Sequence, residues 1–173
     1  MPQGDAHEKH TSVELNMTRP ARVQIGEAFF EWGSRTYIMG VINVTPDSFS
    51  GDGLGEDVDA ALRLALSFQE CGADIIDVGG ESTRPASIYA DAEPTSTEME
   101  LSRVIPVIDT LAAKLSIPIS VDTYKAQVAK EALAAGASLI NDVWGFKRDS
   151  NMGRVAVAAG APVVLVHNQT GTH

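Results

Sequence analysis

Short apolar runs and amphipathic helical stretches alternate along most of this chain. The apolar run Tyr37–Ile42 ends abruptly at Asn43, and a polar segment rich in Thr, Pro, Asp, Ser and Gly follows it. Apolar residues then recur at helical spacing in four stretches, Val58–Gln69, Thr97–Leu115, Val128–Leu133 and Ser150–Ala159. A capping-box pattern, Thr97 with Glu100, marks the start of the second helix. The change of period from strand to helix and back predicts an α/β fold.

A five-residue pattern recurs three times, at Gly72–Ile76, Gly136–Ile140 and Gly160–Val164. Each glycine suits the left-handed residue that closes a helix, and the apolar residues after it begin a strand. With Ile117–Val121 as a further strand, the predicted order is β-α-β-α-β-α-β-α-β. The stretch 22–38 alternates between apolar and polar residues around two glycine turns, which predicts a β-hairpin before the first core strand.

Such alternation indicates a parallel sheet, either doubly wound or closed as a (β/α)₈ barrel of the TIM type. No G-x-G-x-x-G pattern follows the first strand, so the fingerprint of a dinucleotide-binding sheet is absent. We therefore favour the barrel. Its domain is expected over residues 22–173, and residues 1–21 are expected to form a disordered polar extension.

Composition narrows the classes of function. The 173 residues carry 23 acidic and 13 basic side chains, a net charge of −10, which argues against nucleic-acid binding as the main activity. Cys71 is the one cysteine, so an internal disulfide is excluded, and we expect it to be a small buried residue. No apolar run approaches the roughly 20 residues that span a bilayer, and no signal peptide is evident, so we expect a cytoplasmic protein with no membrane partner.

Polar side chains follow every predicted core strand. The strand-end residues are Asn43, Asp77, Asp122, Asn141 with Asp142, and His167. Each alone could be a helix cap or a loop hydrogen bond, but barrel enzymes take their active-site residues from several strand ends at once. Asp and Asn side chains together can bind a ring that bears amide and amine edges.

The segment Gly79–Pro85 adds backbone N–H groups, two hydroxyls and the Arg84 guanidinium, which together suit an anion. No Ser-His-Asp set, zinc-binding H-E-x-x-H helix or phosphate-binding G-x-x-x-x-G-K-[ST] loop is apparent. The residues thus predict a ligand-binding site, and none of these catalytic or phosphate-binding motifs accompanies it.

Five segments resemble the dihydropteroate synthases of folate biosynthesis. They are Met39–Gly53 (MGVINVTPDSFSGDG), Asp74–Pro85 (DIIDVGGESTRP), Ile119–Tyr124 (ISVDTY), Ala135–Val143 (AGASLINDV) and Val163–Gln169 (VVLVHNQ). The resemblance implies a (β/α)₈ barrel that joins p-aminobenzoate to 6-hydroxymethyl-7,8-dihydropterin diphosphate, with Mg²⁺ assisting. The products would be 7,8-dihydropteroate and diphosphate. The family is usually homodimeric and is the target of sulfonamides.

The resemblance also assigns roles to residues of this chain. Asn43 matches a position at the metal and the diphosphate, and Asp122 and Asn141 match ligands of the pterin ring. Thr83 and Arg84 match the second mobile loop of the family. Phe49 and Pro85 match the p-aminobenzoate pocket, and Asp52 is a candidate for the acid of the first loop. In the family the diphosphate is thought to leave first, giving a carbocation conjugated with the ring, so Asp122, Asn141 and Arg84 are the expected catalytic residues.

Four features depart from the family pattern. Asp52 is displaced by one position in Gly51-Asp52-Gly53, the stretch Ala86–Ala92 lengthens the second loop, and Val166 replaces a common Met. A barrel of this type needs about 250 residues, whereas this chain reaches only a fifth core strand. We therefore expect the N-terminal part of such an enzyme, without the later Asp, Lys and Arg-x-His positions.

Two other functions remain open from the sequence. One is a different pterin-binding barrel, such as a methyltransferase that uses methyltetrahydrofolate. The other is a non-catalytic fragment. The segments NVTPDSFS and ESTRP together favour the synthase.

Overall fold

The computed structural model describes residues 22–45, 58–81 and 95–167. A hairpin precedes alternating strands and helices, as the apolar pattern predicts. The elements are β1 (Val23–Ile25), β2 (Ala28–Phe30), β3 (Met39–Asn43), α1 (Val58–Glu70), β4 (Ile75–Gly79), α2 (Thr97–Ala112), β5 (Ile119–Asp122), α3 (Ala126–Ala134), β6 (Leu139–Asp142), α4 (Met152–Ala159) and β7 (Val163–Leu165).

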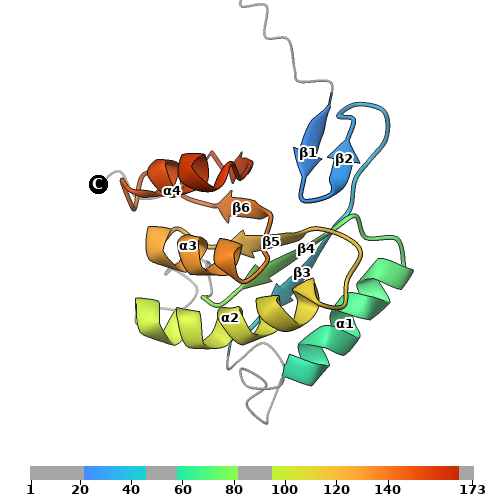
Figure 1. Ribbon diagram of the computed structural model, residues 1–173, viewed down its shortest axis with the longest axis horizontal. Helices are drawn as coiled ribbons and strands as arrows, with labels where there is room; N and C mark the ends of the chain where they lie inside the picture. The colour runs from blue at the N-terminus through green and yellow to red at the C-terminus, as the bar shows by residue number, and fades with distance from the viewer. Residues whose placement is uncertain (1–21, 46–57, 82–94, 168–173) are drawn as a thin grey trace, which may run out of the picture.

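The main sheet has the strand order β3-β4-β5-β6-β7, and every neighbouring pair is parallel. Each strand therefore pairs with the next one in the chain, and all crossovers progress in one direction. Right-handed crossovers of this kind place all their helices on one face of the sheet. Figure 1 shows α1 to α4 following one another around that side. A doubly wound sheet would reverse direction, so the barrel-type prediction is confirmed.

Glycine closes the helices where the repeated pattern predicts it. Gly72, Gly136 and Gly160 have φ values of +94°, +115° and +63°, which L side chains rarely adopt. Gly136 also permits a close approach, because a Cβ built there would lie 2.5 Å from Cβ of Ala112. These positions let each helix end and the next strand begin within a few residues.

Alternate residues of the strands face the helices and form the main core. Ile42, Ile76, Val121 and Ile140 are fully buried there, packed against α1 to α4. A second cluster lies at the amino ends of the strands. There Ile25 and Phe30 of the hairpin pack on Ile75 and Leu139, so the hairpin covers that end of the sheet (Figure 1). The opposite, carboxyl end of the sheet is not covered by the hairpin.

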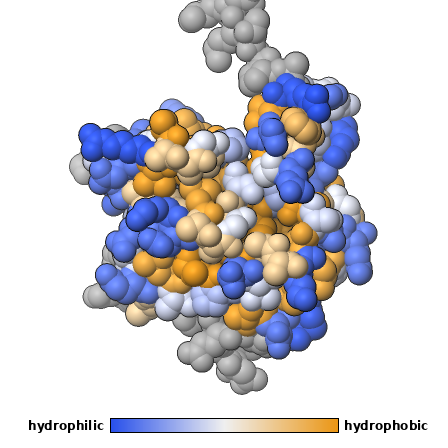
Figure 2. All heavy atoms as spheres, viewed as in Figure 1, coloured by the Kyte–Doolittle hydropathy of each residue, from blue (hydrophilic) through white to orange (hydrophobic). Residues whose placement is uncertain are grey.

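Figure 2 shows a hollow between the hairpin and α4, bordered by apolar side chains. A groove of about 410 Å³ lies between the hairpin and the ends of α3 and α4, with Gly26, Leu133, Ser138 and Pro162 among its lining residues. Because Ser138 and Pro162 precede β6 and β7, this groove lies at the amino ends of the strands. It is therefore separate from the strand ends that the sequence predicts to carry function.

Two local predictions are wrong. The N-cap of α2 is Ser96, whose hydroxyl accepts a hydrogen bond from the backbone N–H of Met99 at 3.2 Å, so the cap lies one residue before Thr97. Cys71 is exposed rather than buried, because it follows the last turn of α1 beside the glycine that turns the chain toward β4. Within the described ranges, no helix is both long enough and apolar enough to cross a bilayer.

Candidate functional site

Three of the predicted site residues lie in one row across the carboxyl end of the sheet. The strand register pairs Asn43 with Gly79, Gly79 with Asp122, and Asp122 with Asn141. Side chains of residues paired in this way point to the same face of a sheet. Their neighbours along the strands, such as Ile42 and Val121, face the helices, so this row faces the other side. We call that side the inner face.

Gly79 brings Asn43 and Asp122 toward each other. A Cβ built on Gly79 would lie 3.6 Å from Oδ1 of Asn43 and 3.6 Å from Oδ2 of Asp122. The two side chains therefore flank the same point above the sheet, and the glycine leaves that point open. A larger residue there would fill the space between an amide and a carboxyl group.

A second row lies one layer deeper on the inner face. Asp77 pairs with Ser120 in the register, two residues before Gly79 and Asp122 respectively. The side-chain Nδ2 of Asn141 donates a hydrogen bond of 3.1 Å to Oδ2 of Asp77 and so links the two rows. The prediction that Asp77 ends its strand is wrong, because it is the central residue of β4.

Four buried oxygen atoms of these two rows have no hydrogen-bond partner among the described residues. They are Oδ1 of Asp77, Oγ of Ser120, Oδ1 of Asp122 and Oδ1 of Asn141. Buried polar atoms in folded proteins are nearly always paired, so four such oxygen atoms on one face are exceptional. They suit a polar ligand that presents N–H or O–H donors.

The electrostatics of the inner face favour positive charge. Burial, followed by the negative charges of Asp77, Glu100, Asp142 and Glu81, raises the pKa of Asp122 to about 7. Burial likewise raises the pKa of Asp77, against the smaller effects of the Ser120 hydroxyl and the Asn141 amide. A ligand that brings N–H donors or developing positive charge to Asp122 would relieve this repulsion.

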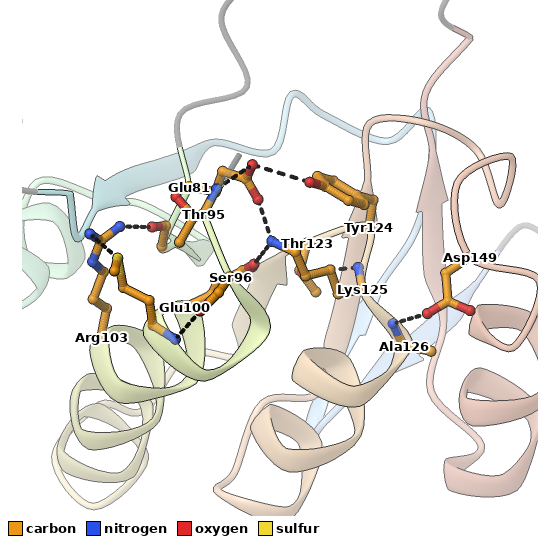
Figure 3. Close-up of polar contacts among 12 residues, drawn as sticks. Glu81, Thr95, Ser96, Glu100, Arg103, Thr123, Tyr124, Lys125, Ala126 and Asp149 are labelled. Atoms are coloured by element: carbon orange, nitrogen blue, oxygen red, sulfur yellow. Dashed lines mark hydrogen bonds and ion pairs between the residues drawn. The ribbon is translucent and has the colours of Figure 1, made fainter. Parts of the chain in front are cut away.

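A buried charge cluster lies beside this row (Figure 3). Nζ of Lys125 forms ion pairs with Glu81 and, at 2.5 Å, with Oε2 of Glu100, which is 1% exposed. Burial alone would lower the pKa of Lys125, but the hydrogen bonds to Glu100 and Glu81 outweigh it, so the pKa is raised. The lysine therefore stays charged and joins the end of β4, the first turn of α2 and the start of α3.

Glu81 has two further partners in this cluster. Its Oε1 accepts hydrogen bonds from the Tyr124 hydroxyl at 3.1 Å and from the backbone N–H of Thr95 at 3.3 Å (Figure 3). Sequence reasoning missed the cluster, because Glu100 fits the pattern of a helix cap and Lys125 lies 25 residues away from it in the chain. The available signal was a Lys three residues after the strand-end Asp122.

The remaining strand-end residues have other roles. Both carboxyl oxygens of Asp142 are used locally, accepting from the backbone N–H groups of Trp144 at 2.8 Å and Phe146 at 2.9 Å. This holds a turn in which Phe146 has a φ of +67°. His167 is exposed and lies two residues beyond β7. Asp142 is thus a structural residue of the turn.

A magnesium ion fits this site only with few protein ligands. In the part of the chain that the structure describes, no group of three His, Cys, Asp or Glu side chains could hold a metal. Asn43 is exposed at the end of β3 and offers an amide oxygen, a ligand type that Mg²⁺ accepts. Mg²⁺ commonly takes one or two protein oxygens and completes its shell with substrate phosphate and water, so Asn43 is compatible with it.

Several predicted site residues lie outside the described residues. These are Phe49, Asp52, Thr83, Arg84 and Pro85, together with the longer loop Ala86–Ala92 and the extension 1–21. Their roles stay predictions. Val166 lies two residues beyond Val164, which pairs with Asn141, so it continues the same alternation just after β7.

Comparison with known proteins gives one consistent family. The sequence pattern of the pterin binding enzymes matches residues 39–173. A dihydropteroate synthase from Clostridium beijerinckii is 50% identical over 150 residues, which cover 87% of this chain and 54% of that relative.

Solved structures of the same kind share the fold. A dihydropteroate synthase from Clostridium difficile, crystallised in the presence of pteroic acid, superposes with a TM-score of 0.74 at 51% identity, over 83% of this chain and 53% of that chain. The Xanthomonas albilineans enzyme with 4-aminobenzoic acid gives a TM-score of 0.77 at 41% identity, over 87% and 52%. This chain therefore spans about half the length of the relatives that it matches.

Proposed function

Because this chain belongs to the pterin-binding enzyme family, we propose that the whole protein is a dihydropteroate synthase. It would join 6-hydroxymethyl-7,8-dihydropterin diphosphate to p-aminobenzoate and release diphosphate. A bond forms between the p-aminobenzoate amine nitrogen and the exocyclic methylene carbon, the bond from that carbon to the diphosphate oxygen breaks, and the amine loses a proton. The observation that carries the proposal is the row of Asn43, Asp122 and Asn141 on one face of the sheet.

The proposed ring site follows from the donor and acceptor atoms. A dihydropterin presents ring and amino N–H groups along one edge, and these need acceptors. Oδ1 of Asp122 and Oδ1 of Asn141 are buried acceptors without partners among the described residues. Pairing them with ring N–H groups would satisfy atoms that otherwise carry the full cost of desolvation.

The proposed catalysis is electrostatic. When the bond to the diphosphate lengthens, positive charge develops on the pterin side, and the acidic groups around Asp122 would stabilise it. Mg²⁺ held near Asn43 would offset the negative charge of the leaving diphosphate. The nearby Lys125 is already engaged by two carboxylates, so it is not a free cation for the diphosphate.

Residues outside the described ranges complete the proposal on the basis of the family resemblance. Arg84 and Thr83 would contact the anionic part of the substrates, and Phe49 and Pro85 would border the p-aminobenzoate ring. Asp52 would serve as the acid of the first loop. The proposal further includes Mg²⁺ dependence, a homodimer, inhibition by sulfonamides and a cytoplasmic location.

Diphosphate release in the presence of both substrates tests the proposal directly. The whole protein should release diphosphate only when p-aminobenzoate is also present, and Asp122→Ala should abolish both pterin binding and turnover. Asp109→Asn, a change of an exposed carboxylate on α2, is the matched control and should leave activity unchanged. Methyl transfer from methyltetrahydrofolate without use of p-aminobenzoate would replace this proposal with a methyltransferase.

The same assay on the isolated 173-residue chain addresses the non-catalytic alternative. Turnover by the whole protein without turnover by this chain would show that the reaction needs residues that this chain lacks. No turnover by either protein would refute the synthase proposal.

A further inference from the structure

Asp77 is a buried acid on the inner face, one layer below the row of Asn43, Asp122 and Asn141. It is 2% exposed and lies at the centre of β4, between Ile75 and Gly79 on the same face. Its register partners are Val41 on one side and Ser120 on the other. Neither can neutralise a carboxylate, so a negative charge on Asp77 has no cation in its own row of the described strands and is costly to bury.

Asp77 accepts a side-chain hydrogen bond from Asn141, a predicted pterin ligand. Nδ2 of Asn141 donates to Oδ2 of Asp77 at 3.1 Å, while Oδ1 of Asn141 is buried and has no partner in the described part of the chain. Amide nitrogen and oxygen are similar in shape but opposite in hydrogen bonding. A carboxylate can only accept, so Asp77 selects the orientation in which the nitrogen of Asn141 faces it and the oxygen faces away.

We propose that Asp77 is a positioning residue that holds the Asn141 carboxamide with its oxygen directed at the ligand, so that the site binds an N–H group of the pterin ring. This inference rests on the proposed function. It adds to that proposal the residue that decides whether Asn141 presents an acceptor or a donor to the ring. Without Asp77, the amide could present its NH₂ group to the same ring atom, and two donors would then face each other.

A purely structural role explains the position less well. Asp77 leaves one of its own oxygens unpaired, and burial raises its pKa, so its charged form opposes folding. Selection for stability alone would favour an apolar residue, such as the valine and isoleucines around it on β4. Such unfavourable groups are typical of functional sites.

Steady-state kinetics of the whole protein test the inference. Asp77→Ala should raise the KM for 6-hydroxymethyl-7,8-dihydropterin diphosphate about tenfold, the order expected for one hydrogen bond, with the KM for p-aminobenzoate within about twofold. Asn141→Ala should raise the first KM at least as much. The double variant should be no worse than Asn141→Ala, because Asp77 acts through that side chain.

A conservative variant and a control separate positioning from folding. Asp77→Asn keeps an acceptor oxygen for the Asn141 amide but can also turn its own NH₂ group toward it, so its pterin KM should lie between those of the wild type and Asp77→Ala. Leu139→Ala changes a buried apolar residue on the same face, in the row of Ser120. It should lower the melting temperature and leave the pterin KM unchanged.

Three results would overturn the inference: an unchanged pterin KM in Asp77→Ala, additive effects in the double variant, or no rescue by Asp77→Asn. If Asp77→Ala does not fold, the double variant Asp77→Asn/Asn141→Asp tests the inference instead. It swaps the two side chains, so it reverses the direction of the hydrogen bond and keeps an acceptor at position 141. This double variant must have a lower pterin KM than Asn141→Asp alone. A KM as high as that of Asn141→Asp overturns the inference. Absence of turnover in the wild type would instead count against the proposed function.

Discussion

We expect Asp122 to bind the ligand and, at the same time, to lower the free energy of unfolding. Its pKa is raised from 3.8 to about 7, first by burial and then by the charges of Asp77, Glu100, Asp142 and Glu81. Replacing it with Asn removes the charge and keeps the shape. Asp122→Asn should therefore make the whole protein more stable at pH 8 and abolish pterin binding.

The sign and size of the effect follow from the two pKa values. The unfolded chain loses the proton near pH 4 and the folded chain only near pH 7, so the free energy of unfolding falls as pH rises between these values. The difference of about three pKa units, at about 1.4 kcal/mol each, sets an upper limit of about 4 kcal/mol above pH 7. Because Asp122 is partly exposed and solvent screens the charge, we expect about 2 kcal/mol at pH 8 and no difference below pH 4.

Urea denaturation at several pH values between 4 and 8 measures this difference. The stability gap between Asp122→Asn and the wild type should grow with pH across that range. Asp109→Asn, which removes the same charge from an exposed position on α2, should show no such growth. A gap that stays constant with pH, or a variant less stable than the wild type at pH 8, would refute the reasoning.

Three further predictions concern other parts of the molecule. Lys125→Met should destabilise the fold by about 3–5 kcal/mol in urea denaturation, because two carboxylates lose their shared cation, whereas Lys130→Met, at an exposed position of α3, should have little effect. Gly136→Ala should lower the melting temperature more than Gly160→Ala, since only the first also meets Ala112; equal effects would contradict this. Treatment with a chelator should abolish diphosphate release, and added Mg²⁺ should restore it.

Much of the fold could be predicted from local sequence. Apolar periodicity and the three Gly-Ala repeats placed the strands and helices, because each signal depends on residues that are neighbours in the chain. The left-handed glycines 72, 136 and 160 confirm it. The predicted N-cap of α2, Thr97, is one residue too late, because Ser96 and Thr97 are adjacent hydroxyl residues and either could cap the helix.

The membership of the site was only partly predictable. A parallel sheet requires strand-end residues to share an edge, so the sequence alone predicts that Asn43, Asp122 and Asn141 lie together. The register confirms that they share one row. Their roles toward substrate stay predictions. Asp142 resembled them in sequence, but its neighbouring backbone N–H groups engage both of its oxygens.

The sequence by itself determined the order of elements, the barrel-type winding and the family, because these depend on periodicity and on contiguous motifs. Only the tertiary structure decided which polar and charged side chains contact each other. Lys125 pairs with Glu81 and Glu100, and Asn141 with Asp77, over separations of 44, 25 and 64 residues. Partners so far apart are chosen by strand register and helix packing, which no local pattern encodes.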